Sequence, residues 1–321
     1  MGMLTHRILK LIKKYKHFTK EDLMLALGMN KSTIDAIINE LLQLGYISKI
    51  DKGLYRYESH NDLSQLDEFL SKLNTRIHFS SLYFYTVSST QLIARDLSER
   101  NCPEGTIVIA EIQTKGRGRH NRSWFSPIGG IWMTIILRPN FPPSIIPLMN
   151  LIVGLAVAKA INNEYNVQAL VKWPNDVMIN DKKVCGILIE CSLKGNLIDY
   201  LLVGIGINAN NSIPPGIDGI SLKDVLGKPI LRIPLIMNLC KILDHYYSLL
   251  VDHNAHELPR VLNELKLLSH TLGKEVLIVL DSGKQIRGKA TDINFSGNLI
   301  ISINGKRLEV AYHEVKKLIY L

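Results

Sequence analysis

Residues 116–127 read GRGRHNRSWFSP and bring glycines, arginines and a tryptophan into one short stretch. Glycines let a backbone present its N–H groups at close range, and guanidinium groups make bidentate, charge-assisted hydrogen bonds to carboxylate or phosphate oxygens. The stretch therefore predicts a loop that binds an anion. Taken alone, it is equally compatible with an RNA-contacting segment or a solvated surface loop.

Strand-like and helical runs alternate on both sides of this loop, which is typical of an α/β domain. The strand-like runs are 106–112, 131–137, 177–179, 187–190 and 200–207, and the helical runs are 91–100 and 148–165. Helical patterns over 234–251 and 258–268 complete this part of the chain. We therefore expect a central mixed α/β domain over residues 61–268.

The N-terminal residues carry a different pattern. Apolar residues at helical spacing predict a helix over 4–16, and a capping-box signature at 19–22 predicts the start of a second helix. A third helix is predicted between residues 30 and 45, from an apolar stripe at i, i+3, i+4 and i+7. Two β-rich runs joined by residues 51–53 (DKG) predict a hairpin. Together these elements predict a winged helix-turn-helix domain over residues 1–60.

Two further segments flank the central domain. The polar residues 59–62 (SHND) are expected to form a linker, and an amphipathic helix is expected over 63–73. Four strand-like runs separated by glycine-containing turns predict a small β-barrel over 269–321. These runs are 276–280, 285–293, 299–303 and 306–311.

The composition excludes several classes of protein. With 46% apolar and 21% charged residues, the chain is neither disordered nor fibrous. Its 38 Lys and Arg against 29 Asp and Glu give a net charge of +9, which favours an anionic partner. Four cysteines without C-x-x-C spacing indicate reduced thiols and a cytoplasmic protein. The uncharged residues 141–158 contain three prolines, so we expect a loop and a buried helix there, and no membrane contact.

A second motif, KWPND, occupies residues 172–176. Pro174 fixes the chain just before Asn175 and Asp176, so both short polar side chains are held at the start of a strand. Magnesium uses one or two carboxylates together with substrate phosphates, which makes Asp176 a candidate Mg²⁺ ligand. The alternative is an Asx turn that caps a hairpin.

A third motif, GIGINAN, occupies residues 204–210. It lacks the third glycine of a dinucleotide-binding fingerprint, and no helical pattern follows it directly. A strand that ends in a close approach to a ligand is the better interpretation. His253 and His256 are three residues apart, but no cysteine or second pair supports a zinc site, so both are expected on the surface.

In this order and spacing, the three motifs resemble those of the biotin protein ligases. The matching patterns are G-R-G-R-x-x-R-x-W-x-S-P, K-W-P-N-D with a lysine seven residues later, and G-x-G-I-N. Residues 89–91 (STQ) resemble the S-T-N turn of that family, and Gln113 precedes the basic loop. The resemblance implies a class II synthetase-like central domain, a C-terminal SH3-like barrel and the winged helix of the bifunctional ligases that also repress biotin genes.

The resemblance implies a reaction in two steps. The carboxylate of biotin attacks the α-phosphate of ATP and expels pyrophosphate, and a lysine of a biotin carboxyl carrier domain then attacks the biotinyl-5′-AMP. The implied ligands are ATP, Mg²⁺ and the substrate biotin. The implied catalytic residues are Lys183, which contacts the biotin carboxylate, Arg119, and Asp176, which lies near magnesium.

The same resemblance assigns the binding residues. Those implied for biotin are Ser89, Thr90, Gln91, Gln113, Gly116, Arg117, Gly118, Arg119, Lys183, Gly186, Leu188 and Gly204. Those implied for ATP are Arg119, Arg122, Trp124, Lys172, Asn175 and Asn208, with Trp124 near the adenine. A flexible second cover is expected over 212–223.

Three residues depart from the commonest family pattern. Gln91 replaces an Asn, which lengthens the amide that reaches the biotin ring. Asn121 stands where many members have Gly, and asparagine tolerates left-handed backbone angles. Residues 313–315 (HEV) replace a G-E-V/I segment of the barrel, which leaves the contact of the barrel with the nucleotide open.

Operator DNA is the second implied partner, and the resemblance leaves a ligand-linked homodimer open. The polar residues of the third helix that could reach base edges are Ser32, Thr33, Asn39 and Gln43, and Lys31 could meet a phosphate. The same residues would serve simple solvation, and a winged helix can also bind protein. An alternative function is a biotin-sensing transcription factor with little ligase turnover, although Lys183, Asp176 and Arg119 argue against it. A lipoate-type ligase would lack the first two motifs.

Overall fold

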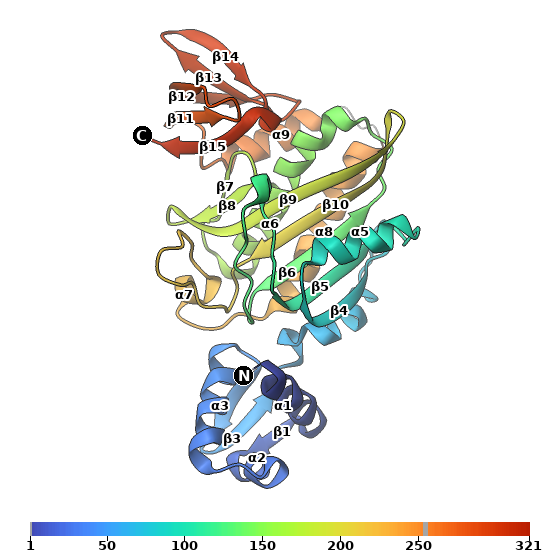
Figure 1. Cartoon of the computed structure of the whole chain (residues 1–321), viewed down its shortest axis with the longest axis vertical. Helices are drawn as coiled ribbons and strands as arrows, with labels where there is room; N and C mark the ends of the chain where they lie inside the picture. Colours follow the sequence, from blue (N-terminus) through green and yellow to red (C-terminus); the bar gives the residue numbers. More distant parts are fainter. Residues whose placement is uncertain (1, 253–255) are drawn as a thin grey trace.

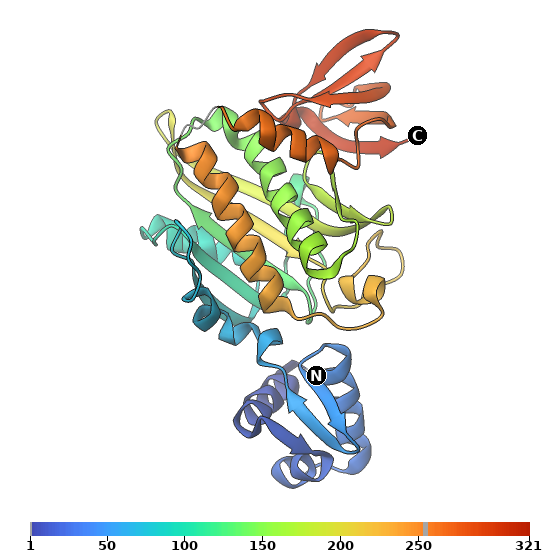
Figure 2. The same cartoon turned by 180° about the vertical axis from the view of Figure 1, so that it is seen from behind.

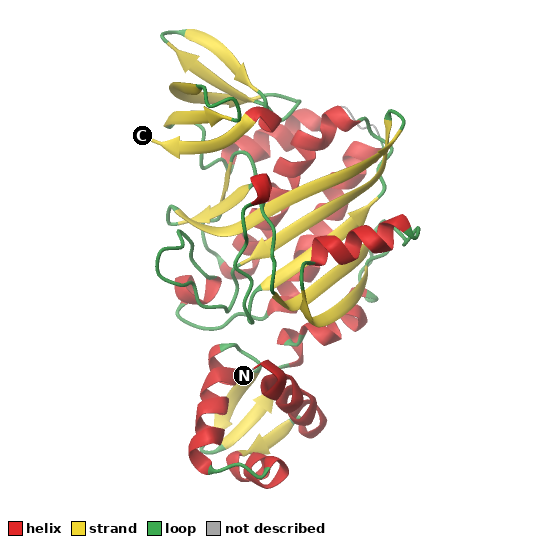
Figure 3. Ribbon diagram, viewed as in Figure 1, coloured by secondary structure: helices red, strands yellow, loops and turns green. Residues whose placement is uncertain are grey.

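The computed structural model of the chain describes residues 2–252 and 256–321, and the side chains from residue 7 onward. Three units follow one another along the longest axis of the molecule (Figure 1). A mainly helical N-terminal unit lies at one end, a sheet covered by helices lies in the middle, and a β-rich C-terminal unit lies at the other end (Figure 3). The expected three-part order of the chain agrees with this arrangement.

The N-terminal unit packs three helices against a small sheet with strand order β1-β3-β2. Its elements are α1 (Gly2–Tyr15), β1 (His17–Thr19), α2 (Lys20–Leu27), α3 (Lys31–Gln43), β2 (Ile47–Asp51) and β3 (Leu54–Tyr57). The capping box is present, since Thr19 accepts from the backbone of Asp22 and Asp22 accepts from Thr19. Gly28, at φ 63°, ends α2 in the left-handed region that favours glycine. Strand β1 was not predicted.

The segment after this unit differs from the expected linker and helix. It forms two short 3₁₀ turns and a helix of five residues, namely η1 (Ser59–Asn61), η2 (Leu63–Gln65) and α4 (Leu66–Leu70). The expected helix over 63–73 is therefore too long. The polar side chains of Asn61 and Asp62 are buried, with exposed fractions of 0% and 5%. Their hydrogen bonds to the neighbouring units, which local sequence does not reveal, explain why this linker is not solvated.

The central unit is a seven-stranded sheet of order β4-β5-β6-β10-β9-β8-β7. Strands β4 and β5 are parallel, and the other neighbours are antiparallel. The strands are β4 (Ser80–Val87), β5 (Thr106–Gln113), β6 (Ile131–Leu137), β7 (Leu170–Lys172), β8 (Asp176–Ile179), β9 (Lys182–Lys194) and β10 (Leu197–Ile207). The edge strands β4 and β7 were not predicted, and the other five were.

Helices cover both faces of this sheet. Three of them, α6 (Ile146–Tyr165), α8 (Arg232–Val251) and α9 (Leu258–Leu267), lie on one face (Figure 2). The other face carries α5 (Thr90–Glu99) (Figure 1). Helix α6 and the turn before it are long and apolar enough to cross a membrane, but 72% of their most apolar window is buried inside the protein. The expected loop followed by a buried core helix is therefore confirmed.

The C-terminal unit is a five-stranded sheet of order β14-β13-β12-β11-β15. Its strands are β11 (Glu275–Leu280), β12 (Gln285–Ile293), β13 (Leu299–Ile303), β14 (Lys306–Val310) and β15 (Val315–Tyr320). The last of these, which closes on β11, was not predicted. The apolar core of this unit is continuous with that of the central unit, whereas the N-terminal unit has a core of its own. The buried Trp173 also donates its Nε1–H to the carbonyl of Gly297, 2.9 Å away.

Candidate functional site

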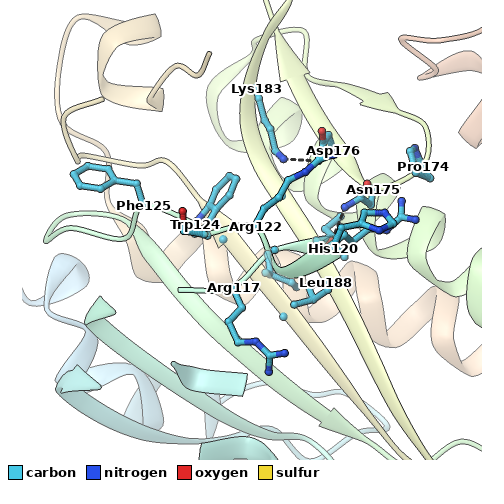
Figure 4. Close-up of a pocket in the computed structure, with 18 of the residues that line it drawn as sticks. Arg117, His120, Arg122, Trp124, Phe125, Pro174, Asn175, Asp176, Lys183 and Leu188 are labelled. Atoms are coloured by element: carbon cyan, nitrogen blue, oxygen red, sulfur yellow. Dashed lines mark hydrogen bonds and ion pairs between the residues drawn. The ribbon is translucent and has the colours of Figure 1, made fainter. Parts of the chain in front are cut away.

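A cavity of about 590 Å³ lies over the sheet, between the basic loop, the 172–176 motif and the start of β15 (Figure 4). Almost every residue predicted to bind a small molecule lines it. These residues are Ser89, Thr90, Gln91, Gln113, Arg117, Gly118, Arg119, Arg122, Trp124, Lys172, Asn175, Asp176, Lys183, Gly186, Leu188, Gly204 and Asn208. The fold thus gathers motifs that are more than 100 residues apart in the sequence.

Gly116 is the one predicted ligand-binding residue that does not line the cavity. A Cβ atom at this position would lie 2.4 Å from the carbonyl oxygen of Trp124 and 2.6 Å from Oγ of Ser126. The backbone N–H of Trp124 also donates to the carbonyl of Gly116 at 2.9 Å. Gly116 therefore closes the base of the loop, where only a glycine allows the two backbone segments to come so close.

The floor of the cavity is a pair of glycine-bearing strands. Gly186 and Leu188 of β9 lie opposite Gly206 and Gly204 of β10 in the antiparallel register. Because side chains alternate along a strand, these four positions share one face. The indole of Trp124 lies against this floor, since a Cβ atom on Gly206 would be 2.5 Å from its Nε1. Gly206 lies in the third motif, where a close approach to a ligand was predicted, but only Gly204 was named among the binding residues.

We expect Gly206→Ala to lower kcat/KM for the nucleotide that the resemblance implies by about 10-fold or more, because the methyl group displaces the Trp124 ring. Steady-state kinetics and the tryptophan emission spectrum check this. Gly118→Ala is the steric control, since its Cβ would have no neighbour closer than 3.6 Å. An equal loss in both variants would contradict the displacement of the ring as the cause.

Asp176, at the start of β8, and Lys183, near the start of β9, point toward one another (Figure 4). Lys183 Nζ lies 2.6 Å from Asp176 Oδ1 and 4.8 Å from the centre of the Trp124 ring. Lys172 adds a third charge to this wall, 4.7 Å from the ring of Tyr320. Burial lowers the pKa of Lys172 below its ordinary value, although Asp176 opposes that shift. The wall is therefore a cationic surface with one carboxylate, and an anion is its natural ligand.

The opposite end of the cavity is uncharged and polar. Oε1 of Gln113 accepts from the backbone N–H of Thr90 at 2.8 Å, which fixes the turn of residues 89–91 against β5. Nε2 of Gln91 donates to Glu190 at 3.1 Å, so the longer amide bridges to β9. Ser89 Oγ and Gln91 Oε1 are buried and have no hydrogen-bond partner among the described residues. Buried polar atoms are nearly always paired, so these two favour a polar, uncharged ligand.

The basic loop is held by the C-terminal unit. Arg119 donates to the carbonyls of Tyr312 and Val315 at 3.2 and 3.0 Å, and its guanidinium lies 4.4 Å from the centre of the Tyr312 ring. Arg122 donates to the carbonyl of Lys316 at 2.9 Å. By contrast, Arg117 lies 3.5 Å from Glu190 and points away from Lys183. The loop arginines thus line the cavity while their guanidinium groups are anchored on its rim.

The backbone of this loop uses two left-handed residues in a row. Asn121 has φ 56°, which agrees with the expectation that asparagine can replace glycine there, and His120 has φ 53°. His120 also contacts the carbonyl of Val315 at 3.2 Å. Two consecutive positive φ values are uncommon outside glycine, so the contacts with the C-terminal unit stabilise the turn.

Several lining residues were not predicted. They include His120, Ser123, Phe125, Ile213, Ile217, Asp218, Val315, Lys316, Lys317 and Leu318. The segment expected as a second cover supplies Ile213, Ile217 and Asp218, and it ends in the short helix α7 (Leu222–Leu226). The last four belong to the C-terminal unit, where β15 had not been predicted.

Asn175 uses its Nδ2 to donate to the carbonyl of Ile187 at 2.8 Å, which holds the 172–176 motif against β9.

Carboxylates are sparse around the cavity. Among the described residues, no cluster of three His, Cys, Asp or Glu side chains could hold a metal ion. The acidic residues that line the cavity are Asp176 and Asp218. This set fits Mg²⁺, which binds one or two carboxylates and takes its other ligands from phosphates and water. It does not fit zinc, and His256 is exposed, while His253 lies outside the described residues.

The predicted DNA-contacting residues lie along α3. Lys31, Ser32, Asn39 and Gln43 are exposed, and Thr33 is half-buried. Ser32 and Thr33 donate to Oδ1 of Asn30, which caps the helix. Gln43, however, lines a groove between α3 and the central unit, so this end of the helix faces protein.

Comparison with known proteins agrees with this geometry. A profile of the Biotin/lipoate A/B protein ligase family matches residues 83–208, and one of the Biotin protein ligase C terminal domain matches residues 271–312. The chain is 33% identical to the bifunctional ligase/repressor BirA of Bacillus subtilis, over 87% of each chain. It is 35% identical to the bifunctional ligase/repressor BirA of Bacillus spizizenii, over 72% of this chain and 73% of that one. A solved biotin protein ligase from Aquifex aeolicus in complex with biotin and ATP superimposes with a TM-score of 0.65 at 29% identity, over 75% of this chain and 99% of that chain.

Proposed function

The chain belongs to the biotin protein ligase family, and from this we infer that it is an ATP-dependent biotin ligase that also acts as a repressor. It activates biotin with ATP to biotinyl-5′-AMP and transfers biotin to a lysine of a biotin carboxyl carrier domain. The observation that carries this function is the single cavity in which Lys183, the basic loop and the turn of residues 89–91 meet. One end of that cavity is cationic, and at the other end uncharged polar side chains of residues 89–91 and Gln113 line it, as an acid with a neutral ring requires.

We propose that biotin binds with its ureido ring at the uncharged end and its carboxylate toward Lys183. Ser89 Oγ and Gln91 Oε1 supply a hydrogen-bond donor and an acceptor for the ring, since both are buried without a partner among the described residues. The apolar side of the ring lies on the glycine floor beside Leu188. Lys183 then holds the carboxylate close to the nucleotide.

The first step must bring two anions together. Arg119, Arg122 and Lys172 offset the repulsion between the carboxylate and the triphosphate, and they stabilise the charge that develops at phosphorus. Trp124, which lies against the floor, is our proposed surface for the adenine. In the second step Lys183 stabilises the phosphate charge of the departing AMP. Mg²⁺, held by Asp176 and the phosphates, would add charge neutralisation to these groups.

The direct test is incubation of the protein with ATP, Mg²⁺, biotin and a biotin carboxyl carrier domain, followed by mass measurement of the carrier. We expect biotin to be added at one lysine. A carrier domain with that lysine changed to Arg is the control. Binding of biotin and ATP without transfer would instead support a biotin sensor with little turnover, and transfer of lipoate but not biotin would support a lipoate-type ligase.

The N-terminal unit is our proposed winged helix-turn-helix, with α2 and α3 as the two helices and the β2–β3 hairpin as the wing. It supports operator binding through the exposed side chains of α3. We propose that the C-terminal sheet is an SH3-like barrel and that the protein acts in the cytoplasm, where its four free thiols stay reduced. The domain boundaries after residues 60 and 268, and a ligand-linked homodimer, remain predictions.

Lys31→Ala should weaken binding to all DNA sequences and lower the salt slope of the binding constant by about 1, because it removes one phosphate contact.

Asn39→Ala should relax the sequence preference at one base pair, with a loss of about 1–3 kcal/mol in the free energy of binding to the operator. Gel shifts on the upstream region of the protein's own gene, with biotin and ATP present, measure both effects. Lys289→Ala, an exposed lysine of β12, is the matched control. If the wild-type protein gives no shift at low salt, it is not a repressor of that region.

A further inference from the structure

A buried arginine joins the N-terminal unit to the sheet beneath the substrate cavity. Arg232, the first residue of α8, and Glu111 of β5 are both 0% exposed. Nη1 and Nη2 of Arg232 donate to the two carboxylate oxygens of Glu111 at 2.8 and 3.0 Å, which is a bidentate pair. Nη1 also donates to the carbonyl of Gly130 at 2.9 Å. These contacts belong to the central unit alone.

The remaining donors of this guanidinium reach the connecting segment and the N-terminal unit. Nε donates to Oδ1 of Asn61 at 2.8 Å, and Nη2 donates to the backbone carbonyl of Asn61 at 2.5 Å and to the hydroxyl of Tyr46 at 3.1 Å. Asn61 and Tyr46 are both fully buried. The guanidinium of Arg232 therefore bonds Glu111 of the central unit, Asn61 of the connecting segment and Tyr46 of the N-terminal unit at once, which distinguishes this contact from a flexible tether.

The end of α3 enters the same network. The carbonyl of Leu44, just after α3, accepts from Nδ2 of Asn61 at 2.7 Å and from Nδ2 of Asn210 at 3.0 Å. Gly45 follows at φ 74°, and a Cβ atom there would lie 2.8 Å from Nδ2 of Asn61. The chain thus leaves the proposed recognition helix through a position that admits no side chain.

Two residues of this network, Glu111 and Asn210, are each only two positions in the sequence from a residue that lines the cavity. Glu111 precedes Gln113 by two residues on β5, and Asn210 follows Asn208 by two residues after β10. Gln113 and Asn208 both line the substrate cavity. Asn208 also accepts from Nδ2 of Asn211 at 3.2 Å, and Asn211 is fully buried beside Asn210.

A groove of about 440 Å³ also lies between the N-terminal unit and the central unit. Gln43 and Leu44 line it from the N-terminal unit, and Ile128 and Pro215 line it from the central unit. Two further residues, Phe125 and Ile213, line both this groove and the substrate cavity. The two loops that carry these residues therefore line the substrate cavity and also the groove beside the end of α3.

We propose that Arg232 is a positioning residue that couples the substrate cavity to the end of α3, so that occupancy of the cavity orders residues 41–46. Arg232 fixes Asn61, and Asn61 and Asn210 both bond the carbonyl of Leu44 at the end of α3. Gln113 and Asn208, which lie close by along the chain, line the cavity in which we propose that the substrates bind. The inference rests on the proposed function, because it requires biotin and ATP to bind in the cavity. By linkage, the N-terminal unit must in turn stabilise the bound substrates by the same factor.

Hydrogen–deuterium exchange on the full chain tests this without DNA. We expect biotin, ATP and Mg²⁺ to slow amide exchange in residues 41–46 by about fivefold or more in the wild type. In the variant Tyr46→Phe/Asn61→Ala the ratio of the exchange rates without and with ligands should fall to near one. The affinity for biotin, measured by calorimetry, should drop by the factor that this ratio loses. If the double variant folds poorly, Tyr46→Phe alone is measured in its place. It removes a single hydrogen bond to Arg232, so we expect an intermediate response.

Tyr57→Phe is the matched control, since it removes the hydroxyl that bonds Asp62 in the same segment but leaves Arg232 untouched. A wild type that binds biotin but shows no change in residues 41–46 overturns the coupling and leaves the ligase function intact. A response in Tyr46→Phe/Asn61→Ala equal to that of the wild type, or an equal loss in Tyr57→Phe, overturns the role of Arg232. A wild type that binds neither biotin nor ATP overturns the function and the coupling together.

Discussion

Replacing Lys183 by alanine should lower biotin transfer to the carrier domain at least about 100-fold. Its ammonium group is placed 2.6 Å from Asp176 and above the ring of Trp124, at the cationic end of the cavity. Without it, the biotin carboxylate meets the triphosphate with less compensation, and the departing AMP loses a cation. Single-turnover mass measurement separates formation of biotinyl-5′-AMP from its transfer, and we expect both steps to slow.

The neighbouring lysine provides the control for this experiment. Lys182 is exposed, lies at the same turn and does not line the cavity, so Lys182→Ala should retain transfer within about twofold. Thermal unfolding of Lys183→Ala should match that of the wild type, because the ion pair with Asp176 is only partly buried. Undiminished transfer by Lys183→Ala would remove this residue from the mechanism.

Replacing Arg232 by methionine should reduce the free energy of unfolding by about 3–5 kcal/mol. The substitution leaves the Glu111 carboxylate fully buried without its bidentate partner, and it leaves Asn61 and Tyr46 without a donor. Folded domains are stable by only about 5–15 kcal/mol, so this is a large fraction of the total. Urea unfolding, followed by circular dichroism, measures the loss.

A double variant separates the charge from the packing. Arg232→Met/Glu111→Leu replaces both members of the pair by apolar side chains of similar size, and its loss should be clearly smaller than that of Arg232→Met. Asp96→Ala, which removes an exposed ion pair with Arg100, should change the stability by less than about 1 kcal/mol. Equal losses in Arg232→Met and the double variant would contradict an unpaired buried charge as the cause.

Local patterns in the sequence predicted the features that depend on neighbouring residues. The capping box at Thr19 is an example, because its hydrogen bonds span only three residues. The period-two glycines of β10 likewise indicate a close approach on one face of a strand. The resemblance of the three motifs to the biotin protein ligases implied about half of the residues that line the cavity, including Lys183.

Features that depend on distant residues were missed for a physical reason. Glu111 and Arg232 are 121 residues apart, and Asn61 and Arg232 are 171 apart, so no local signal marks them as partners. Asn61 instead looked like a solvated linker residue. Strand β15 alternates poorly, because Lys316 and Lys317 interrupt its apolar residues. Missing β15 also hid the carbonyls that hold Arg119 and Arg122.

Helix α6 has a consequence for the synthesis of the chain. The large elements that pack against it, namely β7, β8, β9, α8 and α9, all follow it in the sequence. At about 5–20 residues per second, a ribosome needs roughly 4–17 s to translate from the end of α6 to the end of α8. During that interval an apolar helix of twenty residues lacks α8, the element with which it makes its most extensive contacts. Production of the protein should therefore depend on chaperone capacity, and incomplete chains that stop in this interval should aggregate.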